Sequence, residues 1–420
     1  MNILLVNPNT MKNPPVIPIG LEYLITALKK NGHNADILDL CFSKSPKEEL
    51  NMALKERPYD ITGFTIRNID SAVYFNNEFY LHAIKPLIQC VKNYDIPVVL
   101  GGSGFSAMPF EILEYLQADY GIVGPGEIIF PHFLSLYQNN HLKKKIYNGW
   151  DSGVDSKLFH KRGEKIDYSK YLFESGIVGF ETHKGCLKQC PYCIEAGTRV
   201  WYKNIKNIIK EIEFIVNLGY THFHLCDSEF NSDLNFSLDF CMALIERELP
   251  LKWTLYMVPN PYCKELFKLL YEANAYLITL SVDSDKRIQT LNDYSYKDLA
   301  KIIEYCKNYE IELVIDLLTG YPYESIESTK NMLKFFNKHK TKTGISFYYR
   351  IYKNTPLSGL IKKDIKLQNK LTKHYYQKEN FLEPIFFNQL KREIIEEIIA
   401  DNDLFHIAGI IPGVNYQLLK

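Results

Sequence analysis

The sequence predicts an α/β protein in which a doubly wound (Rossmann-like) parallel sheet is followed by a partial (β/α)6 barrel. Short apolar runs alternate with helical patterns, many runs end in turn-forming residues, and the alternation restarts after a polar stretch in mid-chain. At about 100–200 residues per domain, 420 residues correspond to two domains and a small third piece. We therefore expect a first domain over residues 1–140, a linker over 141–174, a barrel over 175–365 and a helical C-terminal extension over 366–420.

The first domain contains five expected strands, four of which end in turn chemistry. The strands are expected at 3–7, 35–38, 61–65, 98–100 and 121–123, and the helices at 19–30, 72–94, 110–116 and 126–137. The turns read Asn7-Pro8-Asn9, Arg67-Asn68, Gly101-Gly102-Ser103-Gly104 and Gly124-Pro125-Gly126. Because ligands bind outside the carboxyl ends of the strands in such sheets, these turns mark a candidate binding site.

The second domain contains six expected strand–helix units. The strands are expected at 176–182, 222–226, 251–256, 276–281, 311–318 and 344–352, and the helices include 205–216, 236–247, 296–309 and 325–338. This pattern is typical of an incomplete barrel, whose site lies at the carboxyl ends of the strands. Residues 141–174 are polar and aperiodic, which indicates a linker, and the tail, including 386–399, has a helical pattern.

The composition excludes several classes of protein. Hydrophobic residues make up 46% of the chain, and 49 basic residues balance 49 acidic ones, so a disordered chain is excluded. The balanced charge removes the electrostatic case for a nucleic-acid or membrane partner. No run approaches the roughly 18 apolar residues of a spanning helix, and the start of the chain lacks the basic region of a signal peptide. We therefore expect a cytoplasmic protein.

Three of the nine cysteines, Cys186, Cys190 and Cys193, lie within eight residues, directly after the first expected barrel strand. Thiolates suit iron–sulfur clusters and zinc. Three thiolates leave one iron of a four-iron cubane open for a substrate or cofactor. Two alternatives remain at this point: a Cys₃His zinc site that includes His183, and a redox dithiol formed by Cys190 and Cys193.

The segment from Thr182 to Cys193 resembles the signature of radical S-adenosylmethionine (SAM) enzymes. The resemblance implies that the three cysteines hold a [4Fe–4S] cluster, that its fourth iron chelates SAM, and that reductive cleavage of SAM yields a 5′-deoxyadenosyl radical. It also implies an electron donor such as flavodoxin or ferredoxin. Leu187 stands where the family often has proline, which changes the stiffness of the loop and not the ligation.

Later strand ends resemble the SAM-binding positions of the same family. The resemblance implies SAM contacts from the residue before the third cysteine and from the ends of four barrel strands, namely Tyr192, Asp227, Ser228, Glu229, Ser281, Asp283, Gly320 and Arg350. A carboxylate is suited to hold the SAM ammonium group. Taken singly, Asp283 or Glu324 is equally well explained as a turn or helix-capping carboxylate, and Tyr323 stands where the family usually has a second glycine.

A doubly wound domain before such a core resembles the cobalamin-binding subclass of the family, over most of residues 1–365. The resemblance implies cobalamin contacts from the strand-end turns, namely Asn9, Thr65, Arg67, Asn68, Gly101, Gly102, Ser103, Gly124, Gly126 and Glu127. Glycines in such a turn let the backbone approach a ligand. The Asp-x-His-x-x-Gly motif, which supplies a histidine to cobalt in other B12 enzymes, is absent, so an empty, purely structural domain remains an alternative.

The third turn suggests a hypothesis about the ligation of cobalt in this chain. We hypothesise that Arg67 faces the lower side of cobalt, because a guanidinium has no lone pair to donate and leaves the metal unligated there. The alternative is an ion pair between Arg67 and Asp70 across the turn.

Together these features predict a cobalamin-dependent radical SAM enzyme, a methyltransferase that acts on an unactivated carbon of a small molecule or peptide. The alternatives are a rearrangement, ring contraction or cyclisation, with cobalamin in a non-methylating role or absent, a polar methylation without a free radical, and a cobalamin or iron–sulfur sensor. Methylthiolation fits less well, because only Cys41 and Cys90 precede the cluster. No residue is assigned a catalytic role beyond cofactor binding.

Overall fold

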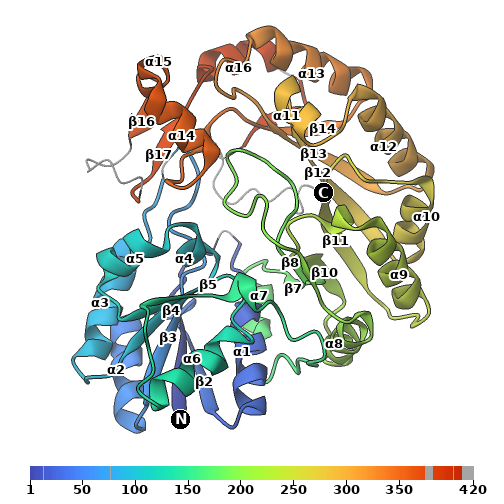
Figure 1. The fold of residues 1–420 in the computed structure, drawn as a ribbon. Coiled ribbons are helices and arrows are strands. Elements are labelled where there is room, and N and C mark those ends of the chain that lie inside the picture. Colours follow the sequence, from blue (N-terminus) through green and yellow to red (C-terminus); the bar gives the residue numbers. More distant parts are fainter. Residues whose placement is uncertain (13, 76, 374–381, 401, 409–420) are drawn as a thin grey trace. The chain divides into compact units, whose positions relative to one another are not determined.

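The computed structural model describes residues 1–12, 14–75, 77–373, 382–400 and 402–408. The chain divides into two compact units. The first contains residues 1–72, 77–179 and 201–218, and the second contains the described residues of 73–76, 180–200 and 219–420. Figure 1 labels the elements of both units. Within the described ranges, no helix has the length and apolar character needed to cross a bilayer.

The first unit is built on a parallel sheet of six strands in the order β2-β1-β3-β4-β5-β6. The strands are β1 (Asn2–Asn7), β2 (Asn34–Asp39), β3 (Ile61–Thr65), β4 (Val98–Gly101), β5 (Tyr120–Val123) and β6 (Ile146–Asn148). The chain adds β2 on one side of β1 and β3 to β6 on the other, so the predicted doubly wound sheet is confirmed.

The first unit also contains helices. They are α1 (Ile19–Lys30), α2 (Pro46–Glu56), α3 (Leu81–Lys92), α4 (Ser103–Ala107), α5 (Pro109–Leu116), α6 (Ile129–Gln138), the short η1 (Gly149–Asp151), α7 (Tyr168–Phe173) and α8 (Ile205–Asn217). Ile3 and Leu5 of β1 pack with Leu28 of α1 and Phe133 of α6 in one buried cluster. Burial of such apolar side chains stabilises the unit by roughly 1.5–3 kcal/mol each.

The expected helix over 72–94 begins only at Leu81. Ala72 has a left-handed backbone with φ of +53°, and its N–H donates to the Asp70 carboxylate at 2.7 Å, which is incompatible with a helical turn. The residues that follow, 73–76, belong to the second unit.

The segment expected as a linker, residues 141–174, is built into the first unit as β6, η1 and α7. Its Arg162 is fully buried. The guanidinium donates to Glu22 of α1 at 3.2 Å, to Glu211 of α8 at 2.7 Å and to the Tyr168 hydroxyl at 2.9 Å. This polar segment therefore contains a buried ion-pair network. The sequence does not indicate it, because Glu22 and Glu211, the partners of Arg162, are far from it along the chain.

The second unit contains a sheet of seven strands in the order β18-β14-β13-β12-β11-β10-β7. The strands are β7 (Val178–Phe180), β10 (His222–Leu225), β11 (Lys252–Met257), β12 (Ala275–Asp283), β13 (Glu312–Leu318), β14 (Lys342–Ser346) and β18 (Phe405–Ile407). Neighbouring strands from β10 to β14, and β14 with β18, pair in parallel. The first six strands confirm the predicted partial (β/α)6 barrel.

The crossover helices lie along the outer side of this sheet (Figure 1). They are α9 (Leu234–Ile245), α10 (Lys264–Glu272), α11 (Lys286–Leu291), α12 (Tyr296–Asn308) and α13 (Ile326–Lys338). The shorter pieces β8 (His183–Lys184), β9 (Trp201–Tyr202) and η2 (Phe230–Ser232) lie between the first two barrel strands or just after β10.

The C-terminal extension, expected to be helical, also contains strands. Strand β15 (Tyr349–Arg350) and helix α14 (Pro356–Lys363) precede it, and α15 (Ile365–Gln368) lies at its start. Within it, α16 (Arg392–Ile399) is accompanied by β16 (Leu371–Lys373) and β17 (Ile385–Phe387), which form an antiparallel sheet with β15, and by β18, which joins the barrel. The purely helical expectation is therefore wrong. Periodicity cannot tell helix from strand in apolar runs of three residues such as Ile385–Phe387.

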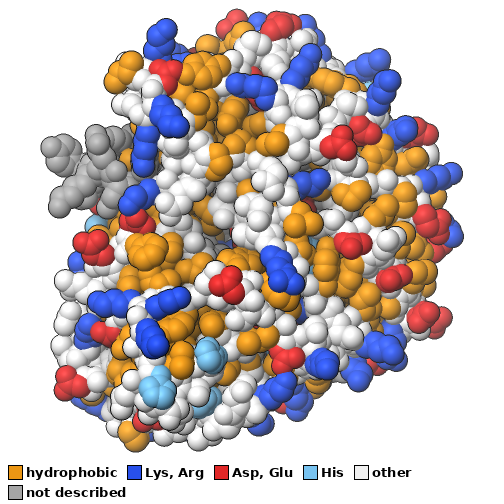
Figure 2. Space-filling model, in the orientation of Figure 1, with side chains coloured by type: hydrophobic (Ala, Val, Ile, Leu, Met, Phe, Trp, Pro, Cys, Tyr) orange, Lys and Arg blue, Asp and Glu red, His pale blue; other side chains and the backbone are white. Residues whose placement is uncertain are grey.

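On the face shown in Figure 2, acidic and basic side chains alternate and neither sign gathers into a continuous area. This agrees with the equal numbers of acidic and basic residues in the chain.

Candidate active site

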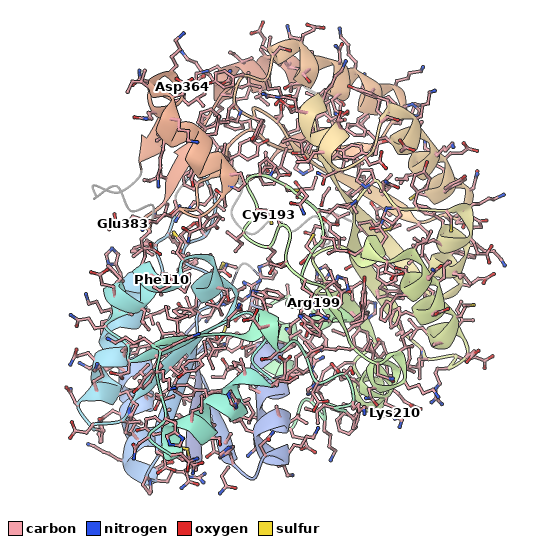
Figure 3. All side chains as sticks on the ribbon, in the orientation of Figure 1. Phe110, Cys193, Arg199, Lys210, Asp364 and Glu383 are labelled. Carbon is pink, nitrogen blue, oxygen red and sulfur yellow. The ribbon has the colours of Figure 1, made fainter. Side chains whose placement is uncertain are left out.

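The three clustered cysteines lie in the loop of residues 181–200, which follows β7 and is called the cluster loop below (Figure 3 labels Cys193 and Arg199 on it). Gly185 has φ of +95°, and a Cβ added there would lie 2.2 Å from the carbonyl oxygen of Arg199. The N–H of Cys186 donates to Oγ1 of Thr198 at 3.0 Å. The two ends of the loop are therefore in direct contact, and only glycine fits before the first cysteine.

Asp227, directly after β10, anchors the beginning of the cluster loop. Its carboxylate accepts the N–H groups of Thr182 at 2.7 Å and His183 at 3.3 Å and also the Thr182 hydroxyl. Nδ1 of His183 lies 3.1 Å from the same carboxylate. Burial lowers the pKa of His183, but Asp227 outweighs it and the net shift is upward. The carboxylate expected to contact SAM thus bonds to the backbone that leads into the cluster loop.

The cysteines themselves form a set of buried or half-buried thiols. Burial raises the pKa of Cys186 to about 11 and that of Cys190 to about 12, and the charge of Cys193 adds to both shifts, which places the three thiols within electrostatic range of one another. Asn292 donates to the Cys190 sulfur at 3.4 Å. Three soft donors grouped in one loop fit an iron–sulfur cluster.

The zinc alternative has less support. Among the residues that the structure describes, no three His, Cys, Asp or Glu side chains converge on a position for a single metal ion. The ring of His183 is instead directed by Asp227. A cluster distributes its irons over several positions, so its ligands do not need to meet at one point.

Two predicted SAM contacts, Tyr192 and Asp283, are joined directly. The Tyr192 hydroxyl lies 3.0 Å from both carboxylate oxygens of Asp283, at the end of β12, and the Tyr192 ring packs on Tyr349 with centroids 5.1 Å apart. Burial raises the pKa of Asp283 to about 8, although the hydrogen bond from Tyr192 opposes that shift. Tyr192, which lies between the second and third cysteines in the sequence, is thus held by the end of β12 and by Tyr349 of β15.

Glu324 acts as a turn carboxylate, which is the alternative that the sequence analysis gave for it. Its carboxylate accepts the N–H groups of Gly320 at 2.6 Å and Tyr321 at 3.0 Å, together with the Ser284 hydroxyl. It therefore closes the turn after β13, where Gly320 has φ of +80°, and ties that turn to the end of β12. Gly320 thus has a conformational reason to be glycine beside its predicted contact with SAM.

Glu229 and Ser281, also predicted SAM contacts, lie together on the inner side of the sheet. Ser281 hydrogen-bonds to the Glu229 carboxylate; burial raises the pKa of Glu229 to about 8, and the nearby Lys188 partly opposes the shift. Among the described residues, Oε2 of Glu229 has no hydrogen-bond partner. The neighbouring Ser228 donates to Glu195 of the cluster loop. An orphaned buried carboxylate oxygen is costly, and the amino group of SAM is a suitable partner for it.

Arg350, the last predicted SAM contact, is buried on β15. Its guanidinium donates to the carbonyl oxygens of Ile351 and, at 2.9 Å, Leu382, and it lies over the Tyr352 ring. These bonds join β15 to the chain before β17, so a contact between Arg350 and SAM stays a prediction.

In the first unit, the glycine-rich turn after β4 packs against the turn after β3. Gly102 has φ of +98°, and a Cβ there would lie 2.7 Å from the Ile66 carbonyl oxygen and 2.9 Å from Oγ1 of Thr65. Ser103 donates to the Arg67 carbonyl oxygen at 2.9 Å. The second glycine of the Gly101-Gly102 pair is therefore required by the neighbouring loop, in addition to any approach of a ligand.

The remaining predicted cobalamin contacts lie at the same edge of the sheet. Asn9 follows β1 and accepts the N–H of Met11, and Asn68 is half-buried after β3. A Cβ on Gly124 would lie 2.7 Å from the Trp150 ring nitrogen, and one on Gly126 would lie 2.8 Å from Leu24.

Glu127 supplies a test of whether this edge suits a polar ligand. Its side chain is buried, and its Oε2 has no hydrogen-bond partner in the described ranges. A buried carboxylate oxygen without a partner is costly, and a polar ligand with donor groups at the strand ends relieves that cost. The residues present therefore fit such a cofactor.

Some contacts around the cluster loop were not predicted. Asn292 reaches Cys190 from beyond α11, and the Lys188 ammonium donates to the Asn260 carbonyl oxygen at 2.5 Å. In each of these two pairs the residues are 70 or more positions apart in the sequence, so no local sequence pattern indicates the contact.

Comparison with known proteins gives two family matches. The model of the B12 binding domain matches residues 13–134, and the model of the radical SAM superfamily matches residues 180–336. The first match lies in the doubly wound unit, and the second runs from β7 through α13 of the barrel.

Individual relatives agree with these matches. The chain is 23% identical to the tryptophan 2-C-methyltransferase of Streptomyces laurentii, over 86% of this chain and 74% of that protein. It is 19% identical to the cytidylyl-2-hydroxyethylphosphonate methyltransferase of Streptomyces wedmorensis, over 64% of this chain and 61% of that protein. The structure of the radical SAM methyltransferase TsrM from Kitasatospora setae, with cobalamin and a [4Fe-4S] cluster bound, superposes with a TM-score of 0.81 at 24% identity, over 90% of this chain and 78% of that one. The last likeness shows the fold.

Proposed function

We propose that this chain, which belongs to the radical SAM superfamily and carries an N-terminal B12-binding domain, is a cobalamin-dependent methyltransferase that acts on a carbon of a small organic molecule. The observation that carries the proposal is the cluster loop, in which three thiols are held by backbone contacts and lie beside the Tyr192–Asp283 and Glu229–Ser281 pairs. When bound, the cluster and SAM supply reductive radical chemistry, and cobalamin supplies methyl transfer.

The protein residues divide the work of holding these groups. Cys186, Cys190 and Cys193 ligate the cluster. Glu229 accepts the SAM amino group, because its carboxylate has an oxygen without a partner in the described structure. Tyr192 lies beside the adenine, with its ring held by Asp283. Burial of these groups excludes water from the reacting atoms.

In the first unit, the strand-end turns from Asn9 to Glu127 receive cobalamin, and Arg67 faces the lower side of cobalt. Methyl transfer is supported over the alternative rearrangements by the two curated relatives described above, which are named methyltransferases. The name of the first relative supports an aromatic amine as the substrate class. An electron donor such as flavodoxin or ferredoxin delivers the electrons.

The test is an anaerobic purification followed by iron, sulfide and cobalt analysis and turnover. With a low-potential reductant, SAM carrying a labelled methyl group and L-tryptophan, we expect about four irons and one cobalt per chain, S-adenosylhomocysteine and a labelled product. Cys193→Ala is the control and loses the cluster and the product. Zinc as the only metal would overturn the proposal, and 5′-deoxyadenosine without methyl transfer would replace it by the rearrangement.

A further inference from the structure

The barrel sheet of the second unit has one polar face. Strand register places His224 opposite Thr254, Tyr256 opposite Thr279, Ser281 opposite Asp316, Asp316 opposite Gly344, and Gly344 opposite His406. Side chains alternate along a strand, and partners in register share a face. Five side chains, one from each of five strands, therefore point to the same side: His224, Tyr256, Ser281, Asp316 and His406.

This polar side is the inner side of the barrel. The opposite face carries apolar residues such as Trp253 of β11, whose ring packs on Phe240 of α9 with centroids 6.0 Å apart. The helices thus cover the apolar face. Interiors of (β/α) barrels are ordinarily filled by branched apolar side chains, so a polar inner face calls for another explanation.

The polar side chains on the inner side of the barrel are only partly buried. The five polar side chains keep accessible surface, although Asp316 lies in the middle of a central strand. On three of these strands, the residue two positions nearer the amino end on the same face is buried: Thr254, Thr279 and Val314. The five partly buried polar side chains, His224, Tyr256, Ser281, Asp316 and His406, are called the polar wall below.

Asp316 is the charged group of this wall that the proposed SAM contacts do not use. Among the described residues, its carboxylate has no hydrogen bond or ion pair. Burial raises its pKa to about 6. The titratable groups that interact with it electrostatically are Glu229, Asp283, Tyr256 and Tyr348, and each is acidic or neutral. Buried carboxylates without a cation are costly, so the wall is complementary to a positive ligand.

The neighbours of Asp316 suit an apolar or aromatic body attached to that positive group. Burial lowers the pKa of His224 to about 4, so its ring is neutral, and its Nδ1 lies 2.9 Å from the Thr254 hydroxyl. Tyr348 stacks on Tyr74 with ring centroids 5.3 Å apart, and Tyr256 contacts the His224 ring at 5.6 Å. Aromatic rings of Tyr256 and Tyr348 therefore lie near the Asp316 carboxylate, and His224 contacts Tyr256.

We propose that Asp316 binds a cationic nitrogen of the organic substrate inside the barrel, so that the substrate class is an amine with an apolar or aromatic body. The inference rests on the proposed function, in which SAM occupies Glu229 and the cluster and leaves the wall to the substrate. Asp316 is a binding residue here, and no proton transfer is assigned to it.

The experiment measures binding to the anaerobic holoenzyme saturated with S-adenosylhomocysteine. The probes are tryptamine, tyramine and hexylamine, each compared by calorimetry with its alcohol, tryptophol, tyrosol or hexanol. At least one amine is expected to bind about tenfold or more tightly than its alcohol, and Asp316→Asn removes this preference while the affinity for the alcohol stays unchanged. The matched control is Glu312→Gln on the same strand, whose carboxylate pairs with Lys342 at 2.8 Å; it keeps the preference.

Three results would overturn the inference: no amine preferred over its alcohol, a preference that survives Asp316→Asn, or an Asp316→Asn variant that loses affinity for S-adenosylhomocysteine instead. Iron content and the melting temperature show that the variant is folded. The proposed function is judged separately: amine preference without methyl transfer would remove that function alone, whereas methyl transfer to a neutral substrate that is unaffected by Asp316→Asn would remove this inference alone.

Discussion

Gly185 and Asp227 are not ligands, yet both determine where the first cysteine lies. The Arg199 carbonyl oxygen lies 2.2 Å from the position that a Cβ of residue 185 would take, and the Asp227 carboxylate accepts two consecutive N–H groups at the beginning of the cluster loop. The sequence carries the identity of these residues, but their roles depend on groups brought near by the fold.

Substitution of Gly185 by alanine tests the close contact between the two ends of the loop. We expect Gly185→Ala to lose most of its iron and its brown absorption, because the loop must open to admit a Cβ. Gly219→Ala is a matched control, since Gly219 has φ of +94° but nothing within 4 Å of its Cβ position. The control pays only the backbone strain of about 1–3 kcal/mol and keeps its cluster. Equal iron content in the two variants would contradict this explanation.

Asp227→Asn separates a positioning role from a SAM contact. The amide oxygen can still accept the two N–H groups, but the NH₂ group replaces the oxygen that accepts the Thr182 hydroxyl and lies beside Nδ1 of His183, at a cost of about 1–3 kcal/mol. We expect less iron per chain and a lower melting temperature, while SAM affinity per remaining cluster is unchanged. A variant with full iron content and weakened SAM binding would instead assign Asp227 to SAM, as the family resemblance implies.

Arg67→Ala tests the environment of cobalt. We expect the absorption spectrum of bound cobalamin to change, because removal of the guanidinium admits water to the lower side of the metal. An unchanged spectrum, with cobalamin still bound in the same amount, would contradict the hypothesis.

Among the elements, the segment before β7 has a structural role that its composition conceals. Arg162 joins α1 and α8 through two buried carboxylates, Glu22 and Glu211. Removal of one partner of a buried ion-pair network destabilises a protein more than replacement of the whole network by apolar residues. The reason is that the remaining charges stay buried without a partner.

We therefore expect Arg162→Met to destabilise the first unit by about 3–5 kcal/mol. Lys161→Met is the control: Lys161 is exposed and pairs with Glu164 on the surface, so its loss costs about 1 kcal/mol or less. Urea unfolding followed by circular dichroism measures both. If the two variants unfold at the same urea concentration, the network does not stabilise the unit.

For the whole molecule, cofactor binding is expected to order the cluster loop. A ligand that binds only the folded state stabilises the elements that hold it, and the cluster loop contains three sites for trypsin, at Lys184, Lys188 and Arg199.

Removal of the cluster by a chelator and oxidant should therefore accelerate tryptic cleavage within residues 181–200 several-fold, because local opening is no longer opposed by iron binding. Mass spectrometry of the fragments locates the cuts. Cys193→Ala protein should be cut at the fast rate before any treatment and should not respond to the chelator. Equal rates for loaded and stripped wild-type protein would show that the loop is ordered by its own contacts.

Much of the fold was predictable because the signals are local. All five strands expected in the first domain are present within one residue at each end, since each is a short apolar run and four of them are followed by turn-forming residues. The barrel strands were found for the same reason. The sequence analysis missed the late start of α3, because nothing in the pattern indicates the left-handed backbone of Ala72. It missed strands β16 to β18, because three residues are too few to show a periodicity. It also missed the structure of residues 141–174, because a single buried Arg162 leaves no periodic pattern.

The sequence alone predicted the three cluster cysteines, since three soft donors at close spacing lie in one loop and need no distant partner. It also indicated the order of the two domains and the strand ends at which cofactors bind. The tertiary structure alone decided that Asp227 supports the loop, that Glu324 closes a turn, and that Asp316 shares the inner face of the barrel sheet with Tyr256 and His224. These roles depend on strand register and through-space contacts, and residues one hundred positions apart share an environment only after the chain has folded.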